Sequence, residues 1–137
     1  MTAADRLRAA RGLKQRYRTD RRAFERIVRE VLNTLPETFR EHLDNVAIVV
    51  AEWPTAADER HGADEDAGES DLMGLYHGTP FTERTTDYHL TVPDQITIYR
   101  QPILAACRSE VETREEIRLT VLHEIGHFFG LGDDELP

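Results

Sequence analysis

Apolar side chains recur at steps of three and four residues in the first patterned segment of the chain. They occupy Phe24, Ile27, Val28, Val31, Leu32 and Leu35. This spacing places them on one face of a helix, and Pro36 marks its end. We therefore predict a core-packing helix that starts after Thr19. The next segment, PETFREHLD, favours a second, shorter helix.

Three apolar stretches have the composition of β-strands. The run VAIVVAEW at 46–53 is β-branched, which is typical of a strand buried on both faces, so we expect it to be the central strand. LMGLYH at 72–77 indicates a short strand, and QITIYR at 95–100 alternates like a half-buried one. Residues 55–70 are rich in Asp, Glu, Ala and Gly without a period, which predicts an exposed loop.

The last helix has the strongest local signals. A short helical segment is expected from Pro102 to Cys107. Thr113 followed by Glu116 fits a capping box at the start of the long helix, and Gly130 is where it should end. Between these signals lies an apolar stripe that should pack in the core, made of Ile117, Val121, Ile125 and Phe128.

Composition favours one soluble domain. The chain has 137 residues, 39% of them hydrophobic, and no apolar run approaches the ~18 residues of a membrane span. No apolar stretch follows the first charges, so no secretory signal is visible and we expect a cytoplasmic protein that does not enter a membrane. Cys107 is the only cysteine, which excludes an internal disulfide. We expect it to be a buried core residue.

Charge divides the chain into two parts. The net charge is −9, yet residues 6–29 hold ten of the seventeen basic residues. Residues 1–18 are predicted to be a basic, mobile N-terminal tail, and residues 19–137 a single domain. A basic arm is also a candidate for nucleic-acid contact. The acidic remainder of the chain makes nucleic acid the least favoured partner.

The chemistry with the clearest signature lies near the C-terminus, in HEIGHFFGLGDDELP. His123 and His127 are four residues apart, hence about 40° apart on one helix face, so both imidazoles can reach one ion. Glu124 falls between this face and the apolar stripe. That placement suits a carboxylate that does not bind the metal but acts as general base on a water molecule that does.

A catalytic zinc normally has three protein ligands and leaves a fourth position for water. Since the sequence ends ten residues after His127, we expect the third ligand to be local or upstream. In the pattern HExxHxxGxxD, Gly130 allows a sharp turn and Asp133 takes the third-ligand position. The neighbouring alternatives are Asp134 and Glu135.

At these residues the chain resembles the mini-zincins, short bacterial zincin-like proteins with HExxHxxGxxD at the C-terminal helix. The blocks GLYHGTPFTERT at 74–85 and PDQITIYRQPIL at 93–104 are similar to two further blocks of that family, so the resemblance covers roughly residues 20–136. It implies an α+β, zincin-like minimal domain with an N-terminal helix, a small mixed β-sheet and a C-terminal active-site helix. It also implies Zn²⁺ bound by His123, His127 and Asp133, with Glu124 in the catalytic position.

The leading hypothesis is therefore a zinc-dependent peptidase that acts on peptides or exposed protein segments. The alternative is a zincin-like binding module with structural or absent metal and no catalysis. Two features depart from larger relatives: there is no methionine turn, and an Asp ligand leaves zinc less electrophilic than His would. In larger zincins a sheet-edge strand binds the peptide, and either LMGLYH or QITIYR is a candidate for that role.

Polar residues elsewhere in the chain are further candidates for the site. Candidates for stabilising a transition state are Tyr76, His77, Tyr88, His89 and Tyr99, and the sequence places none of them near the metal; packed residues are the favoured interpretation. Trp53 is expected in the core or at its rim. The loop residues His61, Asp64, Glu65 and Asp66 lack the ligand spacing of a calcium loop, so we expect them to be solvated.

Overall fold

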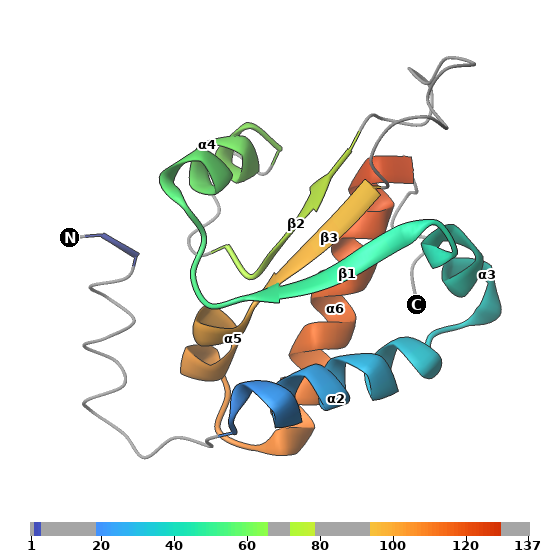
Figure 1. The fold of residues 1–137 in the computed structure, drawn as a ribbon, viewed down its shortest axis with the longest axis horizontal. Coiled ribbons are helices and arrows are strands. Elements are labelled where there is room, and N and C mark those ends of the chain that lie inside the picture. Colours follow the sequence, from blue (N-terminus) through green and yellow to red (C-terminus); the bar gives the residue numbers. More distant parts are fainter. Residues whose placement is uncertain (1, 4–18, 66–71, 79–93, 130–137) are drawn as a thin grey trace.

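The computed structural model describes residues 2–3, 19–65, 72–78 and 94–129 (Figure 1). Its helices and strands, in chain order, are α2 (Arg21–Asn33), α3 (Glu37–Arg40), the short 3₁₀-helix η1 (Glu41–Leu43), β1 (Val46–Ala51), α4 (Ala56–Glu65), β2 (Gly74–His77), β3 (Asp94–Tyr99), α5 (Arg100–Ala106) and α6 (Glu110–Phe129). The predicted tail, residues 1–18, lies almost wholly outside the described residues.

The three described strands form one mixed sheet in the order β1-β3-β2. β3 runs parallel to β1 and antiparallel to β2. α2 and α6 contact each other, α6 also contacts β2 and β3, and Figure 1 shows both helices on the same side of the sheet. Together these elements confirm the predicted α+β class, with an N-terminal helix, a small mixed sheet and a C-terminal helix.

The sheet corrects the predicted strand order. The apolar run at 46–53 forms β1, which is an edge strand of the described sheet, and its Ala47 and Val49 are exposed on one face. The half-buried expectation for residues 95–100 is also wrong, because β3 is central and buries Ile96, Thr97 and Tyr99 on its two faces. The β-branched content of a strand reports its own preference for extended backbone. It does not report how many neighbours the strand will have.

The core fills the space between the sheet and the α2/α6 pair. The predicted stripes of both helices are buried there, with side chains from β3 between them: Phe24, Ile27, Val28 and Val31 from α2, Ile96 and Ile98 from β3, and Ile117, Val121 and Ile125 from α6. The side chain of Phe128 lies outside the described residues. Period-3.6 spacing therefore identified the core faces of both helices correctly.

The predicted loop at 55–70 contains a helix, which is a second correction. α4 spans Ala56–Glu65 and is capped reciprocally at its start: Thr55 Oγ1 accepts from Asp58 N at 3.0 Å, and Asp58 Oδ2 accepts from Thr55 N at 3.1 Å. The segment lacks an apolar stripe, which is why hydrophobic periodicity missed it. The T-x-x-D spacing was the available signal, since it supplies partners for the first orphan N–H groups of a helix.

The long helix α6 also begins one turn earlier than predicted. Ser109 Oγ accepts from Glu112 N at 3.1 Å, and Glu112 Oε1 accepts from Arg108 N at 2.9 Å. Thr113, the predicted cap, is buried inside the helix, and its Oγ1 donates to Ser109 O at 2.9 Å. Two S/T-x-x-E patterns lie one turn apart in this sequence, and the upstream one forms the cap. The last described residue of α6 is Phe129, so the predicted end at Gly130 lies outside the described residues.

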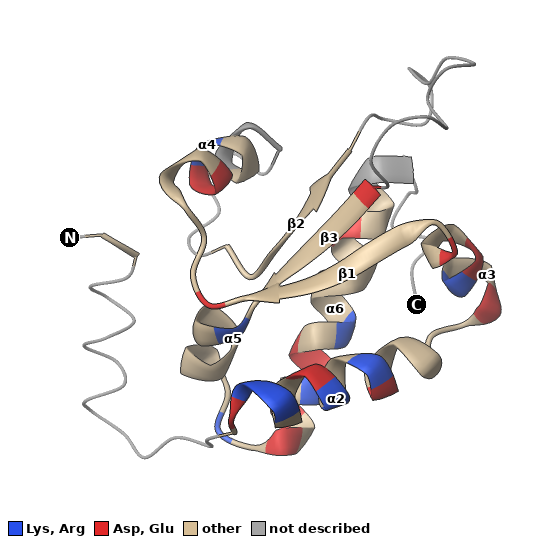
Figure 2. Cartoon of the chain, in the orientation of Figure 1, with Lys and Arg blue, Asp and Glu red and all other residues tan. Residues whose placement is uncertain are grey.

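Ion pairs cover the outer surfaces of α2 and α6. Figure 2 shows acidic and basic residues mixed along α2, in keeping with pairs four residues apart such as Arg21 with Glu25 at 3.2 Å. Arg114 of α6 reaches Glu30 of α2 at 2.6 Å. These side chains are substantially exposed, so solvent and salt screen each pair and its contribution to stability is small. Of the two pairs, Arg114–Glu30 joins the helices, whereas Arg21–Glu25 lies within α2.

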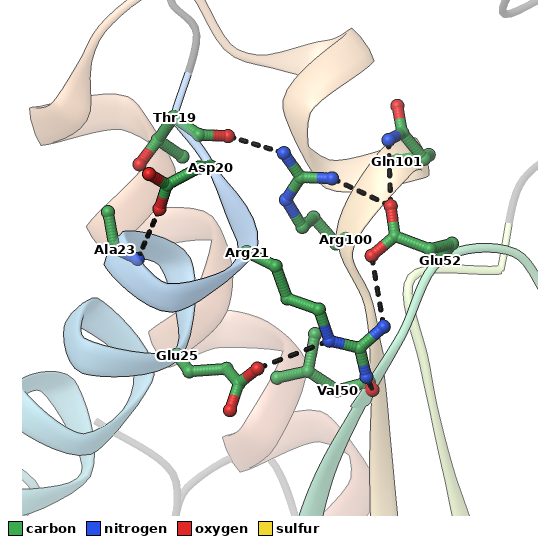
Figure 3. A network of polar contacts seen from close by, with 9 residues as sticks. All are labelled: Thr19, Asp20, Arg21, Ala23, Glu25, Val50, Glu52, Arg100 and Gln101. Carbon is green, nitrogen blue, oxygen red and sulfur yellow. Dashed lines mark hydrogen bonds and ion pairs between the residues drawn. The ribbon is translucent and has the colours of Figure 1, made fainter.

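A polar network centred on Glu52 joins the start of α2 to the end of the sheet (Figure 3). Its carboxylate accepts from Arg100 at 2.6 Å, from Gln101 at 2.9 Å and from Arg21 at 3.3 Å. Burial alone would raise the pKa of Glu52, but the hydrogen bonds from Gln101 and Arg100 outweigh it and hold the pKa below its usual value. Arg21 also donates to the carbonyl oxygen of Val50. That contact covers part of the open edge of β1.

Cys107 is buried, as predicted, at 3% exposure. Burial raises the pKa of its thiol, and the nearby Glu116 and Glu112 carboxylates add to the rise. A raised pKa leaves less of the reactive thiolate at any pH below it. We expect Ellman's reagent at pH 8 to modify the native protein at least ~100-fold more slowly than the denatured chain. A native rate close to that of the denatured chain would contradict the buried position.

No helix among the described residues is both long and apolar enough to cross a bilayer.

Candidate active site

Adjacent residues of α6 face two different environments. His123 is exposed, whereas its neighbour Glu124 is 2% exposed. Successive residues on an α-helix are separated by about 100°, so one side chain can face solvent while the next turns under the sheet. The burial of Glu124 beside an exposed His123 is consistent with the predicted position of Glu124 between the histidine face and the apolar stripe.

The buried carboxylate of Glu124 is fixed by the backbone of β2. Its Oε1 atom accepts a hydrogen bond from Tyr76 N at 2.8 Å. Tyr99 N donates to Met73 O at 2.9 Å, so alternate residues of this strand turn toward β3. The backbone groups of Gly74 and Tyr76 consequently point to the outer edge of the sheet. Glu124 reaches that edge from the helix that packs against it.

A glycine permits this close approach between helix and strand. A Cβ atom at Gly74 would overlap Cγ2 of Thr120, which lies one turn before Glu124 on α6. A glycine is therefore required at position 74 because any larger side chain would overlap Thr120. The short distance between α6 and β2 at this point places the Glu124 carboxylate within reach of Tyr76 N.

The side chain of Tyr76 makes a second buried contact. Its hydroxyl donates to Asp94 Oδ2 at 3.1 Å, and both residues are 3% exposed. Asp94 is the first residue of β3 and lies beside Gly78, where a Cβ would overlap the Asp94 carboxylate. Two buried acids thus contact Tyr76. Asp94 accepts from its hydroxyl, and Glu124 accepts from its backbone N–H.

Two other candidates, His77 and Tyr99, lie on the other face of the sheet. The His77 ring stacks on His61 of α4, with centroids 6.1 Å apart and planes at 13°. Tyr99 is fully buried, and burial followed by the nearby Asp58 raises the pKa of its hydroxyl well above the usual range. It therefore stays protonated at physiological pH. Strand alternation places these side chains opposite to Tyr76, away from α6.

The predicted ligand set is only partly described. The backbone of His127 lies in α6 one turn after His123, but its side chain is outside the described residues, as are Asp133, Asp134, Glu135, Tyr88 and His89. The described residues contain no group of three His, Cys, Asp or Glu side chains with metal-binding geometry. Zinc ligation by His123, His127 and Asp133 therefore stays a prediction.

Sequence reasoning missed two contributors to this arrangement. The sequence indicates Tyr76 for its hydroxyl, yet its backbone N–H is the group that contacts Glu124. Asp94 is absent from the predicted candidates, although an acid at the start of an apolar strand is a visible signal. The structure also separates the two candidate edge strands: β3 has a neighbour on each side, whereas β2 is an edge among the described strands.

Comparison with known proteins places the chain in a family. The sequence model of a family described as zincin-like metallopeptidases matches residues 43–137, and the chain belongs to this family. No curated protein matches it. Among solved structures, a conserved hypothetical protein from Thermus thermophilus is similar, with 21% sequence identity and a TM-score of 0.50. The likeness covers 79% of this chain and 92% of that one, and it supports the fold alone.

Proposed function

We propose that the protein is a zinc-dependent peptidase in which His123, His127 and Asp133 bind the metal and Glu124 is the general base. Membership of the zincin-like metallopeptidase family supports the class of reaction. The observation that carries the assignment of Glu124 is its environment: it is 2% exposed and anchored to the β2 backbone, directly beside an exposed histidine. A merely solvated surface helix would not bury this carboxylate.

The proposed donors suit zinc. Two imidazoles and one carboxylate form a ligand set that catalytic zinc sites use, and they leave a position for water. The exposed side of α6 at His123 is compatible with metal entry from solvent, and His127 follows one helical turn later. Only nitrogen and oxygen donors take part, which agrees with Cys107 being buried in the core.

When bound, zinc would polarise the scissile carbonyl and lower the pKa of a water molecule. The role of Glu124 follows from its anchoring. Because Oε1 accepts from Tyr76 N, the backbone of β2 restrains the orientation of the carboxylate. We assign to this carboxylate the acceptance of the proton from water and its later transfer to the leaving amine.

The substrate proposed is an extended peptide or an exposed protein segment. Of the strands that the structure describes, β2 is the edge strand next to α6, and backbone groups of Gly74 point away from β3 along that edge. An extended chain can pair with such an edge through main-chain hydrogen bonds, with little dependence on its sequence. A small domain offers a shallow cleft, which favours flexible segments over folded ones.

Metal content after dialysis tests the ligand assignment. We expect wild type to retain about one zinc per chain, and His123→Ala and Asp133→Ala to retain much less, because a catalytic site needs three protein ligands. His61→Ala serves as the control, since His61 lies on α4 across the sheet. Equal zinc in wild type and Asp133→Ala would move the third ligand to Asp134, Glu135 or an upstream group. Zinc-loaded wild type that cleaves no member of a broad peptide library would contradict the peptidase and favour a binding module.

A further inference from the structure

We propose that Asp94 and the hydroxyl of Tyr76 are positioning groups for Glu124, an inference that rests on the proposed peptidase function. Neither is expected to touch substrate. They act through the end of β2, whose backbone N–H at Tyr76 holds the carboxylate. The path runs from the Asp94 carboxylate to the Tyr76 side chain, then to the Tyr76 backbone and finally to Glu124.

The strand that holds Glu124 is short and, among the described strands, lies at the edge of the sheet. β2 has four residues, and β3 is its one neighbour within the part of the chain that the structure describes. Tyr76 is its penultimate residue, so its N–H lies where a strand of this kind frays most readily. The hydrogen bond from Tyr76 N can hold Glu124 only as rigidly as the end of β2 is itself held. A contact besides the backbone pairing of β2 with β3 is therefore needed to fix this position.

Asp94 provides that second attachment. Its Oδ2 accepts from the Tyr76 hydroxyl at 3.1 Å, inside the core at 3% exposure for each residue. The hydrogen bond joins the end of β2 to the start of β3 through side chains, in addition to the backbone ladder. A bond to a charged acceptor is about twice as strong as one between neutral groups.

The backbone just after β2 packs closely against the Asp94 carboxylate. Gly78 lies so close to Asp94 that a Cβ on Gly78 would overlap Oδ1 and the carboxyl carbon. The Asp94 carboxylate thus lies between the Tyr76 hydroxyl and the backbone of Gly78. This enclosure restrains Asp94 itself, which is what a fixed support for Tyr76 requires.

Loss of the hydrogen bond between Tyr76 and Asp94 should affect the catalytic step and not substrate binding. If the hydroxyl bond is lost, the Tyr76 ring stays packed, but the strand end and its N–H gain freedom and Glu124 loses its fixed orientation. The general base then samples unproductive positions, which lowers kcat. Peptide pairing along the rest of the β2 edge is unaffected, so KM changes little.

The test compares Tyr76→Phe and Asp94→Ala with a matched control, Tyr99→Phe. The control also removes one buried hydroxyl from the same sheet, but on the opposite face, where that hydroxyl lies near Asp58 of α4. Amide hydrogen exchange is followed by NMR at position 76 and at Ile98, which is fully buried in the central strand β3. The second site reports global opening, so the comparison separates local loosening from loss of stability.

We expect exchange at position 76 to quicken about tenfold relative to Ile98 in Tyr76→Phe and Asp94→Ala, and to stay unchanged in Tyr99→Phe. Asp94→Asn keeps an acceptor oxygen and should restore most of the protection. In hydrolysis assays the first two variants should lose about tenfold in kcat at constant KM. Should Asp94→Ala fail to fold, Tyr76→Phe and Asp94→Asn decide the question.

Unchanged exchange at position 76 in Tyr76→Phe overturns the positioning role, whatever the activity. Equal changes at position 76 and Ile98 reduce the pair to a structural role and overturn it too. Failure of the peptidase proposal looks different: wild type would cleave no peptide, while the local exchange effect would still be present.

Discussion

Replacing Glu124 by Gln is expected to lower the rate of peptide hydrolysis about 10²–10⁴-fold while zinc stays bound. An amide cannot accept the proton that a carboxylate accepts, so general base catalysis is lost. The amide oxygen can still accept from Tyr76 N, and a neutral group costs less to bury at this site, which is 2% exposed. The fold and the metal site should therefore be preserved.

Glu124→Ala forms the comparison that separates chemistry from structure. It should lose the same activity, but it also leaves the buried N–H of Tyr76 without its acceptor, at a cost of about 1–3 kcal/mol in the free energy of unfolding. Measurements of kcat, zinc content and denaturant unfolding on both variants distinguish the two effects. A Gln variant that keeps kcat within a few-fold of wild type would exclude the general base. Loss of zinc in that variant would place Glu124 among the ligands.

The sequence predicted those parts of the fold that depend on local periodicity. The apolar faces of α2 and α6 were identified because a helix must turn one side toward the core, and residues such as Phe24 and Ile125 are fully buried there. Which strand is central could not be predicted, since β1 has the more apolar sequence but β3 has two neighbours. α4 was missed because it has no apolar stripe, although its Thr55 and Asp58 cap was readable.

In the candidate site, too, features set by helix geometry could be predicted, and features set by strand pairing could not. Helix geometry alone separates His123 from Glu124 by about 100°, so their different exposures follow from the sequence. The contact with Tyr76 does not, because every residue except proline carries a backbone N–H and only strand register decides which ones face the sheet edge. Asp94 depends on the same register. The placement of Glu124 on its helix was therefore predictable, and its support was not.

The second large effect is expected at Gly74, where the packing of α6 against β2 can be tested directly. Gly74→Ala places a Cβ on Cγ2 of Thr120, and the same Cβ would lie 3.3 Å from the backbone oxygen of Thr97, which is also a tight contact. Relief requires the helix or the strand to move, which should lower the free energy of unfolding by about 1–3 kcal/mol. Because Glu124 lies one turn along α6, the same displacement should weaken its hydrogen bond to Tyr76 N and reduce hydrolysis.

Thr120→Ser provides the decisive partner variant, because it deletes the methyl carbon that the new Cβ would meet. Alone it should cost only about 0.5–1.5 kcal/mol, the usual loss for one buried methyl group. Combined with Gly74→Ala it should recover most of the stability and activity, so the double-mutant cycle gives a favourable coupling energy. Gly62→Ala is the matched control, since its Cβ meets only the flexible end of Leu72, at 2.8 Å. Additive losses in the cycle would show that the overlap is relieved elsewhere, and that Gly74 is not what sets the distance between Glu124 and β2.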